Sequence, residues 1–137
     1  MSEFFTGVSN EQLAASPIFE GLDEAALDRV RECTHFIGAH PGLHIVRQGE
    51  GGFELYIIVS GTAEVMKDGE TVATLAKGDV FGEMSLLGNS HRNADVVARS
   101  VMSLVSLTAD EFRRLAEDVP EIERRVRDIA EGRRASA

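Results

Sequence analysis

Glycines recur at short intervals between apolar runs in the middle of the chain, and this spacing restricts the fold more than any other feature. Nine of them fall where turns are expected: Gly42, Gly49, Gly51, Gly52, Gly61, Gly69, Gly78, Gly82 and Gly88. The runs between them, such as FELYIIVS, TAEVM, TVATL and VMSLVSL, are rich in β-forming residues. Asp68-Gly69 within KDGE is a strong hairpin signal. Many short, evenly spaced strands predict a closed sandwich or barrel.

Helical patterns flank this region on both sides. At the N-terminal side, Ser9 and Gln12 have the spacing of a capping box and Pro17 closes the segment, while Asp23 precedes a second apolar-periodic stretch as an N-cap. At the C-terminal side, Thr108 and Glu111 form a second capping box. We expect one domain over residues 1–137, with an N-terminal helical segment at 9–33, a β-barrel at 34–108 and closing helices at 109–132.

The second closing helix has a narrow apolar face. We expect Asp118 to cap this helix, with Pro120 near its first turn. Its apolar residues fall at helical spacing: Ile122, Val126 and Ile129. This stripe is expected to face the core, and it is also a candidate surface for self-association.

Composition limits the partners and the compartment of the chain. Lysine and arginine total 14 against 23 aspartates and glutamates, a net charge of -9, which argues against binding to nucleic-acid backbones. The single cysteine, Cys33, excludes an internal disulfide and is expected to be buried. The sequence has neither a signal-peptide pattern nor an apolar run of membrane-spanning length. We therefore expect a soluble, cytoplasmic protein.

The stretch FGEMSLLGNSHRNADVVA, from Phe81 to Ala98, has the residues of an anion site. Gly82 precedes a segment that can form about one helical turn, and backbone N–H groups at a helix start attract anions. Ser85 offers a hydroxyl donor, and Arg92 offers a guanidinium that can bind phosphate oxygens in a bidentate way. Glu83 is suited to accept a hydrogen bond from a sugar hydroxyl. Together these groups predict a pocket for a phosphorylated ribose.

These residues resemble the phosphate-binding cassette of cyclic-nucleotide-binding domains, in which F-G-E-[LIM]-A-L-[LM] is followed by a short loop and R-[AT]-A-[ST]-V. The resemblance extends to SPIFEGLDEAALDRV, to VRQGEGGFELYIIVSGTAEV, to LAKGDVFGE and to the closing helices, and it covers roughly residues 16–130. It implies an α+β, mainly β fold: a double-stranded β-helix, or jelly-roll barrel, flanked by N-terminal helices and two C-terminal helices. It implies a regulatory ligand-binding domain and not an enzyme.

The resemblance also assigns roles to single positions. It places Glu83 on the ribose 2′-hydroxyl, Arg92 on the cyclic phosphate, and the backbone amides of Gly82, Met84 and Ser85 around the phosphate oxygens. Weaker transfers give apolar contacts with base and sugar to Val65, Leu75 and Val97, and a relay to the closing helices to Leu86 or Leu87. Candidates for a contact that caps the base are Ile129, Arg133 and Arg134.

Three positions depart from the family pattern. Ser85 replaces an alanine and is compatible with binding. Asn93 stands where alanine is common and where threonine accompanies a preference for cyclic GMP. Asp95 replaces a serine or threonine donor, and an ionised aspartate is expected to repel the ligand. Two unit charges about 6 Å apart at an effective dielectric of roughly 20 interact by about 3 kcal/mol.

Other interpretations of these residues remain open. Arg92 could pair internally with Asp95 or Glu83, which would leave a self-neutralised pocket. His40, His44 and Glu50 near a β-turn raise the possibility of a metal site, but the proline-glycine turn between the histidines argues against convergence of the two imidazoles. Neither Ser60 nor Ser106 has an arranged base, so no catalytic triad is predicted.

We therefore expect a regulatory module that binds cyclic AMP in preference to cyclic GMP, without a further cofactor or metal. Binding should alter the packing of the C-terminal helices, which would act on a protein partner, on an effector domain or on a second copy of the chain. The alternative is a degenerate domain that keeps the fold and serves as a ligand-free interaction module. A small metalloenzyme is the third hypothesis.

Overall fold

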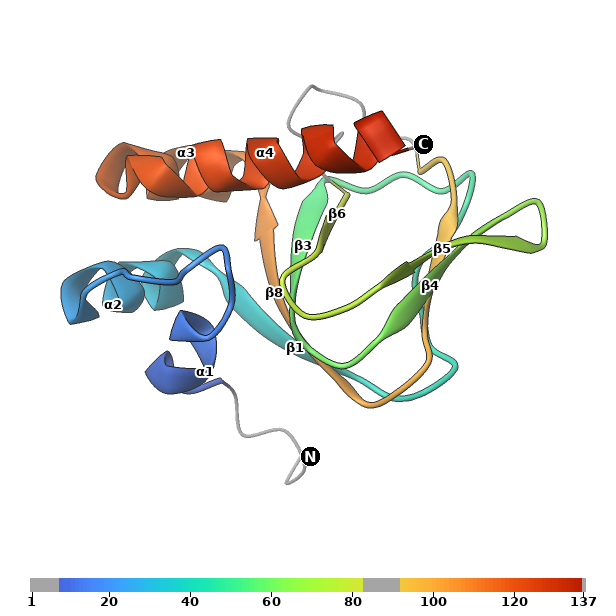
Figure 1. The fold of residues 1–137 in the computed structure, drawn as a ribbon, viewed down its shortest axis with the longest axis horizontal. Helices are drawn as coiled ribbons and strands as arrows, with labels where there is room; N and C mark the ends of the chain where they lie inside the picture. The colour runs from blue at the N-terminus through green and yellow to red at the C-terminus, as the bar shows by residue number, and fades with distance from the viewer. Residues whose placement is uncertain (1–7, 83–91, 137) are drawn as a thin grey trace.

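The structure is a computed structural model that describes residues 8–82 and 92–136, with the backbone alone described for residue 130 and residues 132–136. Its described strands form two antiparallel four-stranded sheets (Figure 1). The first sheet has the order β1 (His35–Ala39), β8 (Met102–Thr108), β3 (Glu54–Ser60) and β6 (Val80–Phe81). The second has the order β2 (His44–Val46), β7 (Asp95–Ala98), β4 (Ala63–Lys67) and β5 (Glu70–Leu75). Two such sheets flanked by helices confirm the predicted jelly-roll fold of the α+β class.

The central strands of the first sheet, β8 and β3, are buried on both faces, and β3 is the clearest case. Leu55, Ile57 and Val59 pack in the cluster that contains the helices, while Tyr56 and Ile58 pack in the barrel interior between the sheets. Successive side chains of a strand point to opposite faces, so a strand buried on both sides has an uninterrupted apolar sequence. This explains why ELYIIV shows no alternation of polar and apolar residues.

The helices gather against the first sheet, away from the β4–β5 hairpin (Figure 1). They are α1 (Asn10–Ala14), α2 (Glu24–Cys33), α3 (Ala109–Asp118) and α4 (Pro120–Ser136). The capping boxes Ser9/Gln12 and Thr108/Glu111 are confirmed, and so are the N-cap at Asp23 and the burial of Cys33. These caps satisfy backbone N–H groups that have no partner within the helix.

The predicted cap of the last helix is wrong. Asp118 is the final residue of α3, and its carboxylate binds Arg29 of α2 instead of the first turn of α4. The acidic residue is used to join two helices, and α4 begins at Pro120, whose missing N–H is not needed at a helix start.

The apolar stripe of α4 lies in the core, as its spacing predicts. Ile122 and Val126 are almost fully buried among residues that include Phe112 and Leu115, and Ile129 packs partly against the same cluster. Burying each such side chain contributes roughly 1.5–3 kcal/mol. The expectation that this stripe mediates self-association is wrong for this conformation, because the chain itself covers it.

Candidate functional site

A short strand and an aromatic pair position Gly82. The strand β6 has two residues, and both pair with β3: Phe81 with Tyr56 and Val80 with Ile57. The rings of Tyr56 and Phe81 stack with their centroids 4.9 Å apart, which adds roughly 0.5–1.5 kcal/mol to the pairing. Phe81 is therefore fixed in the barrel interior, and the next residue, Gly82, is held at the end of the first sheet.

Gly82 meets two separate requirements for glycine. Its φ of 82° lies in the left-handed region, which L-residues other than glycine rarely occupy. A Cβ atom at this position would also lie 2.6 Å from the carbonyl oxygen of Glu54 and 2.8 Å from Nη1 of Arg92. The guanidinium of Arg92 thus approaches the backbone of Gly82 at a distance that no side chain permits.

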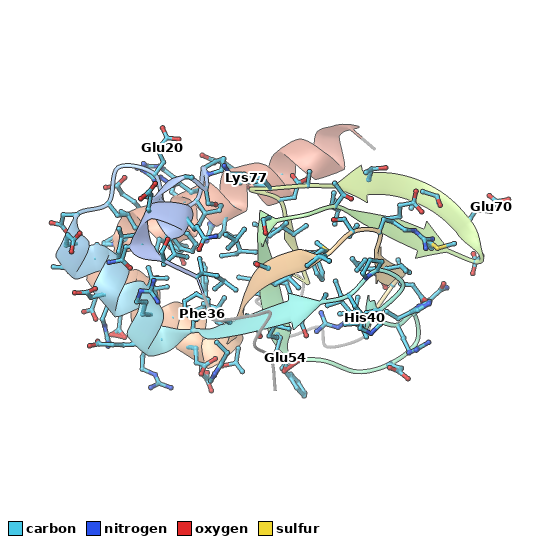
Figure 2. The ribbon with its side chains drawn as sticks, turned by 90° about the horizontal axis from the view of Figure 1, so that it is seen from below. Glu20, Phe36, His40, Glu54, Glu70 and Lys77 are labelled. Carbon is cyan, nitrogen blue, oxygen red and sulfur yellow. The ribbon has the colours of Figure 1, made fainter. Side chains whose placement is uncertain are left out.

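Arg92 is buried, with only 8% of its surface exposed. Its Nη2 donates to the Glu54 carbonyl oxygen at 3.1 Å, at the start of β3, where Figure 2 labels Glu54. Gly52 lies against the same guanidinium, and an added Cβ there would overlap its Nη2, Nε and Cζ atoms. Main-chain bonds complete the placement: Arg92 N–H donates to the Glu50 carbonyl at 3.0 Å, and Gly49 N–H donates to the Arg92 carbonyl at 2.9 Å. The guanidinium is therefore held between two glycines.

Arg92 forms part of the wall of a cavity. Ile45, Val46 and Tyr56 line part of this cavity, and the same side chains pack in the apolar cluster of the barrel interior. Two arginines, Arg47 and Arg92, and two glutamates, Glu50 and Glu54, also line the cavity. An arginine beside an apolar wall can hold the anionic and the hydrophobic part of one ligand.

Sequence reasoning missed several of these lining residues. It identified VRQGEGGFELY as part of the family pattern but gave no site role to Arg47, Gly52, Glu54 or Tyr56. The available signal was the pair Gly51-Gly52 directly before a strand, since adjacent glycines often mark a close approach to the backbone.

The phenol of Tyr56 stays neutral in this cavity. Burial raises its pKa above 10, and the nearby Glu54 carboxylate raises it further, while Arg92 acts in the opposite direction. Tyr56 therefore contributes an apolar face and a hydroxyl group to the cavity, but no charge.

Asp95 does not face the cavity, contrary to expectation. In the β4–β7 ladder, Val96 pairs with Val65 in the barrel interior, whereas Asp95 pairs with Met66 on the outer face. The carboxylate accepts hydrogen bonds from Gln48 N–H at 2.6 Å and from His44 Nδ1 at 2.8 Å. The predicted repulsion of a ligand is therefore not supported, because the strand directs this carboxylate to the opposite side of the sheet.

The predicted internal pair between Arg92 and Asp95 is also wrong. The structure describes both residues, and no salt bridge joins them. The partners of the Asp95 carboxylate are His44 and the amide of Gln48, so it does not neutralise the buried guanidinium.

Successive side chains of β7 point to opposite faces of the sheet, and this corrects one of the predicted apolar ligand contacts. Val65 and Leu75 belong to the barrel interior, as predicted, but Val97 pairs with His44 and Glu64 on the outer face. Val96 takes the interior position. The prediction for Val97 is wrong by one residue, and a shift of one residue reverses the face of a strand.

Several predicted site residues lie outside the described residues: Glu83, Met84, Ser85, Leu86 and Leu87. The same holds for the side chains of Arg133 and Arg134. Asn93 is exposed, and its side chain makes no hydrogen bond to the described part of the chain. Its role and the roles of the cassette residues therefore stay predictions.

The two histidines of the metal hypothesis have different partners. His40 contacts the carbonyl of Pro41, while His44 binds Asp95. Among the described residues, no group of three or more histidine, cysteine, aspartate or glutamate side chains is placed to hold a metal ion.

Comparison with known proteins identifies the family. The family model of the cyclic nucleotide-binding domain matches residues 39–119, which include Gly82, Arg92 and the strands that hold them. The chain belongs to the cyclic nucleotide-binding domain family. Its relatives include a kinase regulatory subunit and a catabolite activator protein, which agrees with the prediction of a regulatory domain and not an enzyme.

Relatives of this cyclic nucleotide-binding domain come from several kinds of protein. It is 36% identical over 100 residues to the cAMP-dependent protein kinase regulatory subunit of Schizosaccharomyces pombe, covering 72% of this chain and 24% of that protein. It is 38% identical over 128 residues to a cyclic nucleotide-gated potassium channel of Rhizobium etli, covering 93% of this chain and 36% of the channel. The chain thus spans well under half the length of either relative.

A solved structure shows the same fold. The regulatory domain of Toxoplasma gondii PKA, crystallised with cAMP, superposes with a TM-score of 0.70 at 26% identity, over 93% of this chain and 49% of that one. Within the described residues, this chain has no helix of the length and hydrophobicity needed to cross a membrane.

Proposed function

We propose that this domain binds cyclic AMP in preference to cyclic GMP, that Arg92 binds the cyclic phosphate, and that binding changes the packing of α3 and α4. The observation that carries the proposal is the buried guanidinium of Arg92, held between Gly52 and Gly82 at the wall of a cavity that is lined in part by apolar side chains of the barrel interior.

The electrostatics of Arg92 favour an anionic ligand. Removing a cation from water is costly unless charged or polar groups replace its hydration. The Glu54 carbonyl supplies one acceptor, and a carbonyl dipole offsets a full charge only in part. A cyclic phosphate presents oxygens that match the planar fork of guanidinium donors. The ligand would thus complete an arrangement that the protein has already formed.

The remaining contacts of the proposal follow the family pattern. Glu83 would accept a hydrogen bond from the ribose 2′-hydroxyl, and the amides of Gly82, Met84 and Ser85 would surround the phosphate. Val65 and Leu75, in the barrel interior, would contact the base and sugar. Asn93 and Ile129 are secondary candidates for contacts that distinguish one base from another.

The preference for cyclic AMP is supported by the relatives. One is described as the regulatory subunit of a cAMP-dependent protein kinase, and one matching structure contains cAMP. Both are similar to this domain over most of its length.

The proposed output uses the contact between β6 and α4. Val80 of β6 packs in the same cluster as Ile122 and Val126 of α4, and the next strand residue leads to Gly82. A ligand that moves Gly82 would therefore disturb the packing of α4 against β6. The ligand can shift α4 between two positions only to the extent that it binds the two corresponding conformations with different affinities. A protein partner or an effector domain that contacts the closing helices would detect this shift.

Isothermal titration calorimetry with cyclic AMP and cyclic GMP tests the proposal. The variant Arg92→Lys keeps the charge but loses the bidentate fork, so we expect binding to weaken roughly ten- to hundredfold. Arg99→Lys is the control, because Arg99 binds Glu64 on the outer face of the second sheet and should leave the affinity unchanged.

Two outcomes would contradict the proposal. Absence of binding by the wild-type domain would favour the degenerate, ligand-free interaction module. Equal affinities of wild type and Arg92→Lys would show that the phosphate is bound elsewhere.

A further inference from the structure

Asp95 is linked to Arg92 through a turn, although its own side chain lies on the outer face of the barrel. Its Oδ1 accepts the amide hydrogen of Gln48 at 2.6 Å, and its Oδ2 accepts a hydrogen bond from His44 Nδ1 at 2.8 Å. Both oxygens are therefore engaged by groups that precede Asp95 by more than forty residues. A half-buried carboxylate with two such bonds fixes the position of the groups that donate to it.

The residue that Asp95 holds belongs to a tight turn. Glu50 N–H donates to the Arg47 carbonyl at 3.1 Å, and Gly49 has a φ of 87°, as a β-turn with glycine at its third position requires. Gln48 is the second residue of this turn. The same turn binds the main chain of Arg92 twice, through Gly49 N–H and through the Glu50 carbonyl. Any displacement of the turn therefore displaces the backbone of Arg92.

The side chain of Gln48 extends the connection to the β4–β5 hairpin. Its Nε2 donates to Asp68 Oδ1 at 3.0 Å, and its Oε1 accepts the amide hydrogen of Asp68 at 3.1 Å. Asp68 lies in the hairpin turn, two residues before Glu70, which Figure 2 labels at the outer end of the hairpin. The turn Arg47–Glu50 is thus held from two sides, by Asp95 and by the hairpin.

We propose that Asp95 is a positioning residue for Arg92, acting through the Gln48 amide and the Arg47–Glu50 turn. This rests on the proposed function in one respect, since the consequence of the positioning is nucleotide affinity. On this proposal, the aspartate that replaces the family's serine or threonine supports the phosphate site through the turn. The charge of this residue alone led to the opposite expectation, that it would repel the ligand.

Amide hydrogen exchange in the ligand-free domain tests the positioning itself. Asp95→Ala removes both acceptor oxygens, so we expect faster exchange of the amides of Gly49 and Arg92. Asp95→Asn keeps an acceptor for Gln48 N–H and should preserve their protection. Asp23→Ala is the matched control, since it removes a carboxylate that accepts an amide hydrogen at the start of α2. It should lower overall stability without a selective effect on Gly49 and Arg92.

Cyclic AMP titration of the same variants tests the consequence. We expect Asp95→Ala to bind roughly tenfold more weakly than wild type, the equivalent of losing one charge-assisted hydrogen bond. Asp95→Asn should bind within about threefold of wild type, as should Asp23→Ala. Tighter binding by both Asp95 variants would overturn the proposal in favour of direct repulsion, and unchanged binding by Asp95→Ala would overturn it as well.

The two experiments separate this inference from the proposed function. If the wild-type domain binds no cyclic nucleotide, the proposed function fails, and hydrogen exchange still decides whether Asp95 positions the turn. If the wild type binds and the exchange of Gly49 and Arg92 is the same in Asp95→Ala, the positioning role is wrong while the function stands.

Discussion

His44 and Asp95 bind one another between strands β2 and β7, on the face of the sheet that points away from the barrel interior, with 2.8 Å between Nδ1 and Oδ2. The hydrogen bond from the Gln48 amide, followed by the one from His44, holds the pKa of Asp95 below its usual range, while desolvation acts in the opposite direction.

This pairing predicts how stability depends on pH. Because the pKa of Asp95 is lowered by folding, its contribution to the free energy of unfolding is complete above the ordinary carboxyl pKa of about 3.9 and is lost as pH falls through the lower folded value. We expect the stability advantage of wild type over Asp95→Asn to shrink between about pH 5 and pH 2. Urea denaturation across this range measures it, and parallel pH profiles would contradict it.

Gly52→Ala should weaken cyclic nucleotide binding, because the added Cβ would overlap the guanidinium of Arg92. Overpacking of this kind costs about 1–3 kcal/mol, or roughly ten- to hundredfold in affinity if the arginine moves. The neighbouring Gly51→Ala is a matched control, since nothing lies within 4 Å of the Cβ added there. Calorimetric titration of both variants decides the matter, and equal affinities would show that Arg92 tolerates the displacement.

Comparing Gly82→Ala with Gly69→Ala separates two costs of replacing a glycine, namely backbone strain at positive φ and steric overlap of the added Cβ. Both glycines have a positive φ, 82° and 83°, but an added Cβ meets nothing within 4 Å at Gly69. Gly69→Ala should therefore cost about 1–2 kcal/mol of stability from backbone strain alone. Gly82→Ala adds contacts with Glu54 and Arg92 and should cost about 2–5 kcal/mol. Denaturant unfolding gives both values, and equal losses would mean that the contacts relax without cost.

Arg125→Ala should loosen α4 from the N-terminal segment. Its Nη1 donates to the carbonyls of Ile18 at 2.9 Å and Glu20 at 2.7 Å, so the guanidinium joins segments that are far apart in sequence. We expect a loss of about 1–3 kcal/mol and faster amide exchange in α4. Arg124→Ala is the adjacent control, because Arg124 is exposed and has a long ion pair with Glu121. Equal effects of the two variants would indicate a general loss of helix propensity.

The sequence alone predicted features that depend on a few neighbouring residues. The hairpin at Asp68-Gly69 has positive φ at both positions, as its turn requires, and both capping boxes formed where their spacing placed them. Residue chemistry alone pointed to Gly82 and Arg92 as parts of an anion site, and the resemblance of the cassette to a family assigned their roles. The match to the cyclic nucleotide-binding domain confirms the family, while the roles of Glu83, Met84 and Ser85 stay predictions.

Tertiary structure decided everything that depends on register and on distant partners. Whether residue 95 or residue 96 faces the barrel interior follows from the pairing of β7 with β4. Because side chains alternate between the two faces of a strand, an error of one position in the register places every side chain on the wrong face. The acceptor of the Arg92 guanidinium is the carbonyl of Glu54, 38 residues earlier at the start of β3. Asp118 binds Arg29 of α2, 89 residues earlier, instead of capping α4. Local sequence sets backbone conformation, because caps and turns are satisfied within a few residues. The partners of a buried charge are set by which strands the fold brings together.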